Sequence, residues 1–106
     1  MTDTHPRHRL ADALNSPVRL SIVAALSRVE KADFKVLRDT IEVSDSALSK
    51  QLTMLEDAGY VSISKGRSGR RPRTWVRLSR HGRDALDRHL AALQDIATLT
   101  PPTTMP

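Results

Sequence analysis

The stretch SDSALSKQLTMLEDAGYVSISKGRSGRRPRTWVRLSRHGRDAL, residues 44–86, contains the patterns that decide the fold. In its first third, Leu48, Leu52 and Leu55 follow the spacing of one face of an α-helix. A glycine comes shortly after them, and glycine is the usual residue just beyond the end of a helix. We therefore expect a helix over residues 45–58, with its leucines turned toward a core.

The remainder of the stretch changes to the two-residue period of β-strands. Residues 60–64 and 74–78 each alternate apolar and polar side chains. Between them, residues 66–72 include two glycines and a proline, which favour a loop. The pattern predicts a two-stranded hairpin with a long tip, followed by a final helix over residues 80–97. Because an isolated hairpin is only marginally stable, it must pack against the helices.

Upstream of the stretch, further helices are expected. Residues 34–41 have apolar side chains at helical spacing and precede the next helix by a short turn, which is the helix-turn-helix pattern. A Ser-Pro pair begins a helix over residues 17–28, and residues 30–33 form a break. A first helix is expected over residues 8–14. The fold class is therefore α+β and mostly helical.

The positive charge of the chain is gathered in one segment. The formal net charge is +5, yet residues 65–83 alone contain eight Lys or Arg residues and no acidic residue, which leaves −3 for the rest. A basic charge concentrated in this way is typical of a protein that binds a polyanion. The alternative is a solubilising loop, although solubilising surfaces usually mix both signs of charge.

The polar face of the helix over residues 45–58 is the first candidate binding surface. A recognition helix presents its N-terminal half and its solvent face to the major groove of DNA, where Lys50 can reach a guanine edge or a phosphate. Asp45 can serve the helix dipole or accept a hydrogen bond from a cytosine amino group. Without the hairpin, the same pattern would describe an ordinary polar helix face. The residues expected to contact DNA here are Ser44, Asp45, Ser46, Ser49, Lys50 and Thr53.

The tip of the hairpin is the second candidate surface. Its two glycines let the backbone approach a phosphate closely, and arginines inserted into the minor groove read its width and negative potential. On the following strand, Trp75 can stack on a base, but a half-buried anchor for the hairpin is the favoured interpretation. The residues expected to contact DNA from the tip and its edges are Lys65, Arg67, Ser68, Arg70, Arg71 and Arg73.

These patterns together resemble MarR/ArsR-like winged helix regulators, above all the short winged helix DNA-binding domain proteins. The similarity rests on S-x-x-x-L-S-x-x-L-x-x-L-E-x-A-G-Y-V over residues 44–61 and on L-S-x-x-G-R-x-A-L over residues 78–86. Residues 14–26, LNSPVRLSIVAAL, resemble the opening of the same group. The resemblance covers about residues 10–95. It implies a winged helix-turn-helix with a basic β-hairpin wing that binds operator DNA, usually as a two-fold dimer and usually as a repressor.

The final helix has a wider apolar stripe than one partner needs. The part around Leu86 and Leu90 can cover the domain's own core, which leaves the part around Ala85, His89 and Ile96 unpartnered. We therefore expect terminal dimerisation helices and a homodimer, with half-sites about one DNA turn apart. The expected interface residues are Leu10, Leu14, Ala85, His89, Ala92, Leu93 and Ile96.

Length and composition predict one small domain. The chain has 106 residues, of which 39% are hydrophobic, enough for a single core over residues 7–98. The polar residues 1–6 and the Pro/Thr-rich residues 99–106 are expected to be flexible ends. The chain has no cysteine, no long apolar run and no secretory signal, so a cytoplasmic location is expected.

Other classes of function have weaker support in the sequence. A Gly-x-Ser-x-Gly elbow and a phosphate-binding glycine loop are both absent, which disfavours the common hydrolases and nucleotide-binding enzymes. Asp87 and His89 match one half of the zinc site of some ArsR-type sensors, but Ala92 stands where the other half would be, so no cofactor or metal is expected. Two alternatives stay open: a winged helix that binds another protein, and a nonspecific nucleic-acid binder. An unidentified small-molecule effector is a further potential partner.

Overall fold

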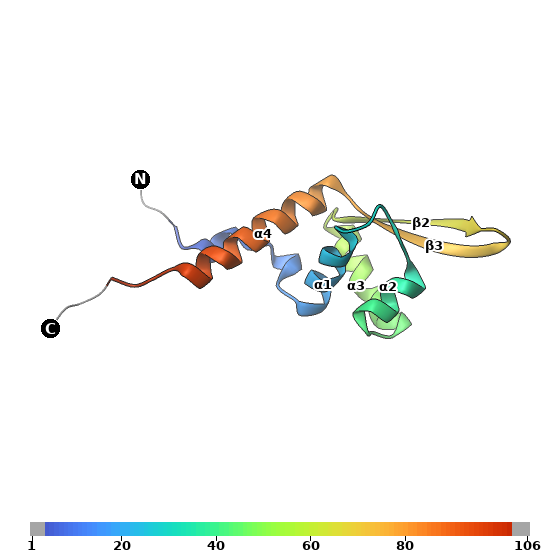
Figure 1. The fold of residues 1–106 in the computed structure, drawn as a ribbon, viewed down its shortest axis with the longest axis horizontal. Helices are drawn as coiled ribbons and strands as arrows, with labels where there is room; N and C mark the ends of the chain where they lie inside the picture. The colour runs from blue at the N-terminus through green and yellow to red at the C-terminus, as the bar shows by residue number, and fades with distance from the viewer. Residues whose placement is uncertain (1–3, 103–106) are drawn as a thin grey trace.

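The computed structural model describes residues 4–102 and has the expected α+β, mostly helical architecture. The three strands form one antiparallel sheet in the order β1-β3-β2. Figure 1 shows the β2–β3 hairpin extending from one end of the molecule and the C-terminal part of α4 from the other. The elements in chain order are the 3-10 helices η1 (Pro6–Arg9) and η2 (Asp12–Leu14), then α1 (Pro17–Leu26), β1 (Ala32–Asp33), α2 (Phe34–Ile41), α3 (Asp45–Asp57), β2 (Val61–Ser68), β3 (Arg71–Leu78) and α4 (Arg80–Thr98).

Each α-helix begins at a residue whose side chain caps it. Ser16, Asp33, Ser44 and Ser79 each accept a hydrogen bond from a backbone N–H two or three residues further along. These bonds satisfy amide groups that have no partner inside the helix. In the turn between α2 and α3, Glu42 adopts a left-handed backbone with φ of 62°. The caps and this residue together fix the geometry of the helix-turn-helix.

An aliphatic core lies between the helices and the inner face of the sheet. The leucine stripe of α3 is fully buried in it, as expected. Burial of such side chains is the main source of stability in a domain of this size. The buried cluster consists of Leu14, Ile22, Val23, Leu26, Leu37, Leu48, Leu52, Leu55, Val61, Val76, Ala85 and Leu86.

The hairpin differs from the sequence prediction at its tip. Residues 66–72 are not a loop, because pairing continues as far as Ser68 opposite Arg71. Only Gly69 and Arg70 form the turn, and Gly69 supplies the positive φ, 63°, that a two-residue hairpin turn requires. All the basic residues of the hairpin except Arg70 therefore lie on two paired strands, which hold them more rigidly than a loop would.

The N-terminal segment also differs from the prediction. The α-helix expected over residues 8–14 is wrong: η1 and η2 are two short 3-10 helices joined by Leu10 and Ala11, whose backbones are extended. The extended geometry turns the N–H of Ala11 toward the side chain of His89 on α4, to which it donates a hydrogen bond. Figure 1 shows this segment running beside α4.

The structure differs from the sequence prediction in smaller ways at the ends of the domain and at the break before α2. Pro6, inside the segment expected to be flexible, is buried at the start of η1. The expected break over residues 30–33 contains β1, a strand of two residues that pairs with β3. Residues 1–3 and 103–106 lie outside the described part of the chain. Within residues 4–102, no helix combines the length and the apolar content needed to cross a membrane.

Candidate nucleic-acid interface

The first turn of α3 is organised by Ser44. Its Oγ accepts a hydrogen bond from the backbone N–H of Ala47 at 3.1 Å and lies 3.3 Å from Oγ of Ser46. Ser44 thus caps the helix, and both Ser44 and Ser46 are exposed. Helix N-termini attract phosphate because their first N–H groups and the helix dipole are positive.

Asp45, at the first position of α3, is held by an arginine of the preceding helix. Nη1 of Arg38 lies 2.8 Å from Oδ1 of Asp45, and Nε of Arg38 lies 2.9 Å from Oδ1 of Asp39. The hydrogen bonds to Asp39 and then to Asp45 raise the pKa of Arg38 above its ordinary value, so the guanidinium stays charged. Sequence reasoning missed Arg38, because its contact with Asp45 crosses between two helices and follows no periodicity.

The solvent face of α3 carries the other predicted contact residues. Ser49, Lys50 and Thr53 are all exposed, on the side away from the buried leucines. The hydroxyl of Thr53 donates to the carbonyl oxygen of Ser49 at 3.0 Å, so it presents its lone pairs outward. Ser49, Thr53 and Thr74 of β3 border a common hollow of about 330 Å³. The polar face of α3 therefore adjoins the base of the hairpin.

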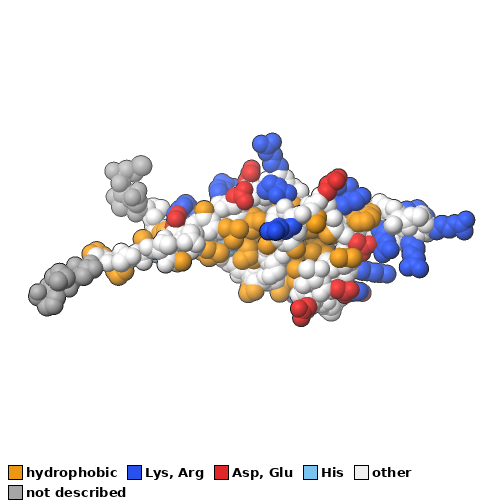
Figure 2. Space-filling view, in the orientation of Figure 1, with side chains coloured by type: hydrophobic (Ala, Val, Ile, Leu, Met, Phe, Trp, Pro, Cys, Tyr) orange, Lys and Arg blue, Asp and Glu red, His pale blue; other side chains and the backbone are white. Residues whose placement is uncertain are grey.

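The β2–β3 hairpin, called the wing from here on, carries a group of exposed basic side chains. Figure 2 shows Lys and Arg side chains gathered at the end of the molecule that the wing forms. Arg67 donates to the carbonyl oxygen of Arg70 at 3.3 Å, which ties one side chain to the turn. No salt bridge within residues 4–102 involves five of the six predicted wing residues. These exposed residues are Lys65, Arg67, Ser68, Arg70 and Arg71.

Arg73 and Arg77 differ from the other basic residues of the wing. Nη1 of Arg73 lies 3.2 Å from Oδ2 of Asp33, the residue that caps α2, and Arg77 pairs with Glu30 at 3.4 Å. Arg73 was expected to contact DNA, but its charge is already neutralised by a carboxylate that is 11% exposed. Its position fits a role in fastening the wing to the helix-turn-helix.

Trp75 is half-buried and anchors the wing, as the favoured interpretation predicts. The ammonium group of Lys31 lies 4.3 Å from the centre of its ring, within the range of a cation–π interaction. On the neighbouring strand, a Cβ at Gly66 would lie 3.2 Å from the indole, so glycine leaves room for the ring. The ring is therefore enclosed on two sides.

A short capped recognition helix next to a paired basic wing is the arrangement of winged helix proteins. Residues 18–97 match the family described as winged helix DNA-binding domain. The chain belongs to this family. Its architecture also confirms the resemblance to MarR-type regulators that the sequence patterns indicate.

Relatives and solved structures agree with the membership. An uncharacterized protein of Methanocaldococcus jannaschii is 30% identical over 76 residues, which cover 72% of this chain and 83% of that protein. A transcriptional regulator homologue from Pyrococcus horikoshii is 29% identical, with a TM-score of 0.77 over 82% of this chain and 86% of that one. A MarR family transcriptional regulator from Silicibacter pomeroyi is 25% identical, with a TM-score of 0.65 over 79% of this chain and 55% of that one.

In this winged helix protein, the face of α4 expected to remain uncovered is covered by the chain itself. Ala85, His89 and Ala92 are buried, as is Leu14 of η2. The expectation that this face of α4 forms a leftover apolar patch is therefore wrong, because η1 and Ala11 lie against α4 where a second copy was expected. Of the other predicted interface residues, Leu10 and Ile96 are partly exposed and Leu93 is 37% exposed.

The apolar side chains that α4 does expose lie further round the helix. Leu90, which was expected to cover the core with Leu86, is instead 45% exposed, because it lies beyond the part of α4 that packs on the core. Leu93 is 37% exposed, and Leu99, just after the helix, is 56% exposed. At 100° per residue, Leu90, Leu93 and Ala97 lie within one narrow sector of α4. This sector, rather than the one containing His89, is the unpartnered apolar surface of the helix.

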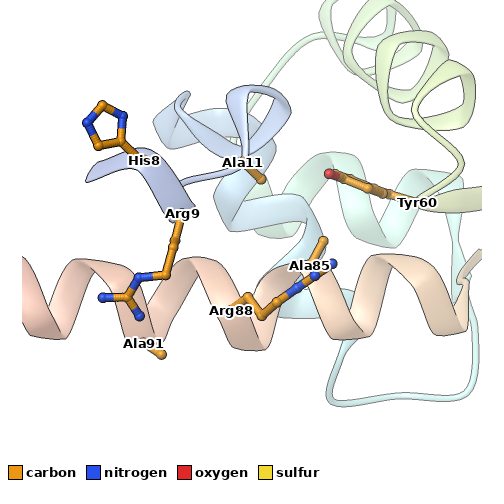
Figure 3. A pocket seen from close by; sticks show the side chains of 7 residues that line it. All are labelled: His8, Arg9, Ala11, Tyr60, Ala85, Arg88 and Ala91. Atoms are coloured by element: carbon orange, nitrogen blue, oxygen red, sulfur yellow. The ribbon is translucent and has the colours of Figure 1, made fainter. Parts of the chain in front are cut away.

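A hollow of about 370 Å³ lies between the N-terminal segment and α4 of this winged helix chain. In Figure 3, Arg9 reaches from η1 toward α4, Arg88 lies along the helix, and the hydroxyl of Tyr60 points toward Ala11. Arg9 is paired with Asp95 at 2.7 Å. Tyr60 comes directly before β2, so the hollow adjoins the connection between α3 and the wing. Sequence reasoning did not foresee this hollow, because nothing predicted how η1 packs.

Proposed function

We propose that this winged helix regulator of MarR type binds a specific duplex DNA sequence as a homodimer and represses transcription from it. The observation that carries the proposal is the shared hollow between α3 and the wing, which brings exposed Ser49 and Thr53 beside the basic hairpin. A helix in the major groove and a wing over the adjacent backbone or minor groove can then bind one DNA segment together. Because chromosomal DNA is the partner, we expect the protein to act in the cytoplasm.

The contact residues of the proposal are divided between two roles. Lys50, with its neighbours on α3, reads base edges, while the free wing cations bind phosphate and add sequence-independent affinity. Arg73 is reassigned to support of the wing, since Asp33 already neutralises it. Ser44 is likewise assigned to capping, and Ser46 remains a proposed DNA contact.

The proposed homodimer uses the exposed sector of α4 around Leu90 and Leu93. Exposed leucines on a long helix that extends beyond the rest of the domain favour association. Leu10, Leu93 and Ile96 remain candidate interface residues from the sequence prediction. Two recognition helices related by a two-fold axis would read two half-sites, which multiplies discrimination between sequences.

We further propose that the hollow beside Tyr60 binds a small-molecule effector. The guanidinium of Arg88, which forms no salt bridge within residues 4–102, the phenol of Tyr60 and the apolar side chains of the alanines in the lining suit a small organic anion with an apolar body. A ligand there contacts both the N-terminal segment and the link between α3 and the wing. Thermal unfolding with and without a panel of small carboxylates tests this, with Arg88→Ala as the variant that should lose any stabilisation.

Selection of bound fragments from a random duplex pool tests the main proposal. We expect a motif of two inverted half-sites separated by about one DNA turn. Competition with unrelated duplex DNA and with double-stranded RNA separates this outcome from nonspecific binding. In cells, deleting the gene should raise transcription next to a selected site. Enrichment of no sequence, or equal competition by every nucleic acid, would refute specific regulation.

A further inference from the structure

Arg38 on α2 holds a carboxylate at the end of α3 that is expected to face DNA. The side chain of Arg38 is 28% exposed and that of Asp45 is 70% exposed. The arginine is therefore largely covered, whereas Asp45 is open to a ligand that approaches the start of α3. Oδ1 of Asp45 accepts the bond from Arg38, and within residues 4–102 no hydrogen bond uses Oδ2 of Asp45.

The side chains around Asp45 have a net negative charge, which does not attract phosphate. Arg38, Asp39 and Asp45 together have a net charge of −1, at the end of α3 where a phosphate-binding site would be positive. An exposed carboxylate there weakens binding to DNA unless it receives a hydrogen bond, because an acceptor that loses water without a new donor is destabilising. On most DNA sequences such a carboxylate weakens binding, and only on the few that offer a hydrogen-bond donor is this loss removed. It therefore contributes to specificity more than to affinity.

The major groove offers one donor that suits a carboxylate. Cytosine presents its N4 amino group there, and Asp and Glu are the side chains that accept from it. We propose that Asp45 is a specificity-determining residue that accepts a hydrogen bond from a cytosine amino group through Oδ2. Arg38 is a positioning residue that fixes the carboxylate through Oδ1 and offsets its charge. This inference rests on the proposed function, because it requires α3 in the major groove.

The test compares base preference among variants of the full chain. Selection from random duplexes should give the wild-type protein a cytosine preference at one position in each half-site. Replacing that cytosine should weaken binding by about 5- to 150-fold, the range of one good base contact. Asp45→Ala should abolish this preference alone, and Asp45→Asn should shift it toward adenine, with which an amide pairs. Arg38→Ala should weaken the same preference and leave the salt dependence of binding unchanged.

Asp39→Asn is the matched control, since it removes the other carboxylate bound to Arg38 and should leave the cytosine preference intact. Arg38→Lys keeps a cation that cannot bind two carboxylates in a fork, so a partial loss is expected, and this variant serves if Arg38→Ala does not fold. Retention of the preference in Asp45→Ala would overturn the proposal. So would an Arg38→Ala variant that binds every sequence more weakly with a shallower salt slope, because Arg38 would then contact phosphate. A wild-type protein that selects no sequence would instead refute the proposed function.

Discussion

The backbone N–H of Ala11 donates a hydrogen bond to Nδ1 of His89 across 3.0 Å. His89 is 1% exposed, so this bond joins the N-terminal segment to the middle of α4 inside the fold. Because Nδ1 is the acceptor, the imidazole is neutral and its proton resides on Nε2. Protonation of Nδ1 would remove the acceptor and place a charge in a buried site.

This bond predicts a specific dependence of stability on pH. Burial lowers the pKa of His89 below its ordinary value of 6.5. Well above pH 6.5 the imidazole is neutral in both the folded and the unfolded chain, so this group adds no pH dependence there. Below pH 6.5 the unfolded chain binds a proton that the folded chain excludes, and the free energy of unfolding decreases as the pH falls toward the folded pKa. Urea denaturation at pH 7.5 and 5.5 measures this difference.

Two variants distinguish the contribution of His89 to this pH dependence from that of the other histidines. His89→Leu leaves the N–H of Ala11 buried without a partner, which should cost about 1–3 kcal/mol at pH 7.5. It should also reduce the loss of stability between pH 7.5 and 5.5. His8→Gln, at an exposed position, should leave that loss unchanged. If wild type and His89→Leu lose stability equally on acidification, His89 does not cause the effect.

Gly82 predicts a second stability effect, at the start of α4. A Cβ at Gly82 would collide with the carbonyl oxygen of Tyr60 and lie 2.7 Å from Cδ1 of Leu78. The same carbonyl oxygen accepts the N–H of Ser79 at 2.8 Å, so it cannot move away freely. Gly82→Ala should destabilise the fold by about 1–3 kcal/mol despite the higher helix propensity of alanine. Asp84→Ala, exposed on the same turn, is the control; an equally stable Gly82→Ala would contradict the close packing.

Much of the fold could be predicted because caps and periodicity are local signals. Ser44 and Ser79 mark helix starts, and the leucine stripe of α3 identifies its buried face. The two-residue turn at Gly69 was missed because glycine and proline also favour loops, and only strand pairing distinguishes the two cases. The strand β1 was missed because two residues give no period, and its pairing with β3 is a tertiary contact.

In the candidate site, the solvent exposure of side chains could be predicted from the sequence, but their contacts with residues distant in the sequence could not. Helical spacing placed Lys50 and Thr53 on the solvent face, and the structure agrees. Periodicity could not show that Asp33 neutralises Arg73, since 40 positions separate them. Nor could it show that η1 and Ala11 cover the face of α4 around His89, because the apolar stripe of a helix does not identify what buries it.

The wing should supply sequence-independent affinity. Arg70 and Arg71 are exposed at its tip, and neither forms a salt bridge within residues 4–102. Replacing both with alanine should weaken binding to all DNA and flatten the salt dependence by about one unit of slope per lost phosphate contact. Arg7→Ala, exposed in η1 at the other end of the molecule, should change neither quantity. Fluorescence anisotropy at several salt concentrations measures both; an unchanged slope in the double variant would remove the wing tip from the interface.

Lys50 should contribute to readout. It is exposed on the polar face of α3, in the half of the helix that is expected to enter the groove. Lys50→Ala should cost about 1–3 kcal/mol on the preferred sequence if the ammonium binds a base, and less on random DNA. Glu56→Ala, exposed near the other end of α3, is the control. Equal losses on both DNAs would reassign Lys50 to a phosphate, and no loss on either would exclude it from the interface.

Assembly depends on the exposed sector of α4. Leu93→Glu and Ala97→Glu together place two charges in the sector that contains Leu90, so a dimer formed through this surface should dissociate at micromolar concentration, and binding to a two-fold site should weaken. Ala91→Glu is the control, because it adds a single negative charge at an exposed alanine outside that sector. Light scattering gives the mass of each variant. A dimer that survives the double substitution would mean that another surface mediates assembly, and a wild-type monomer that persists on DNA would refute the dimer.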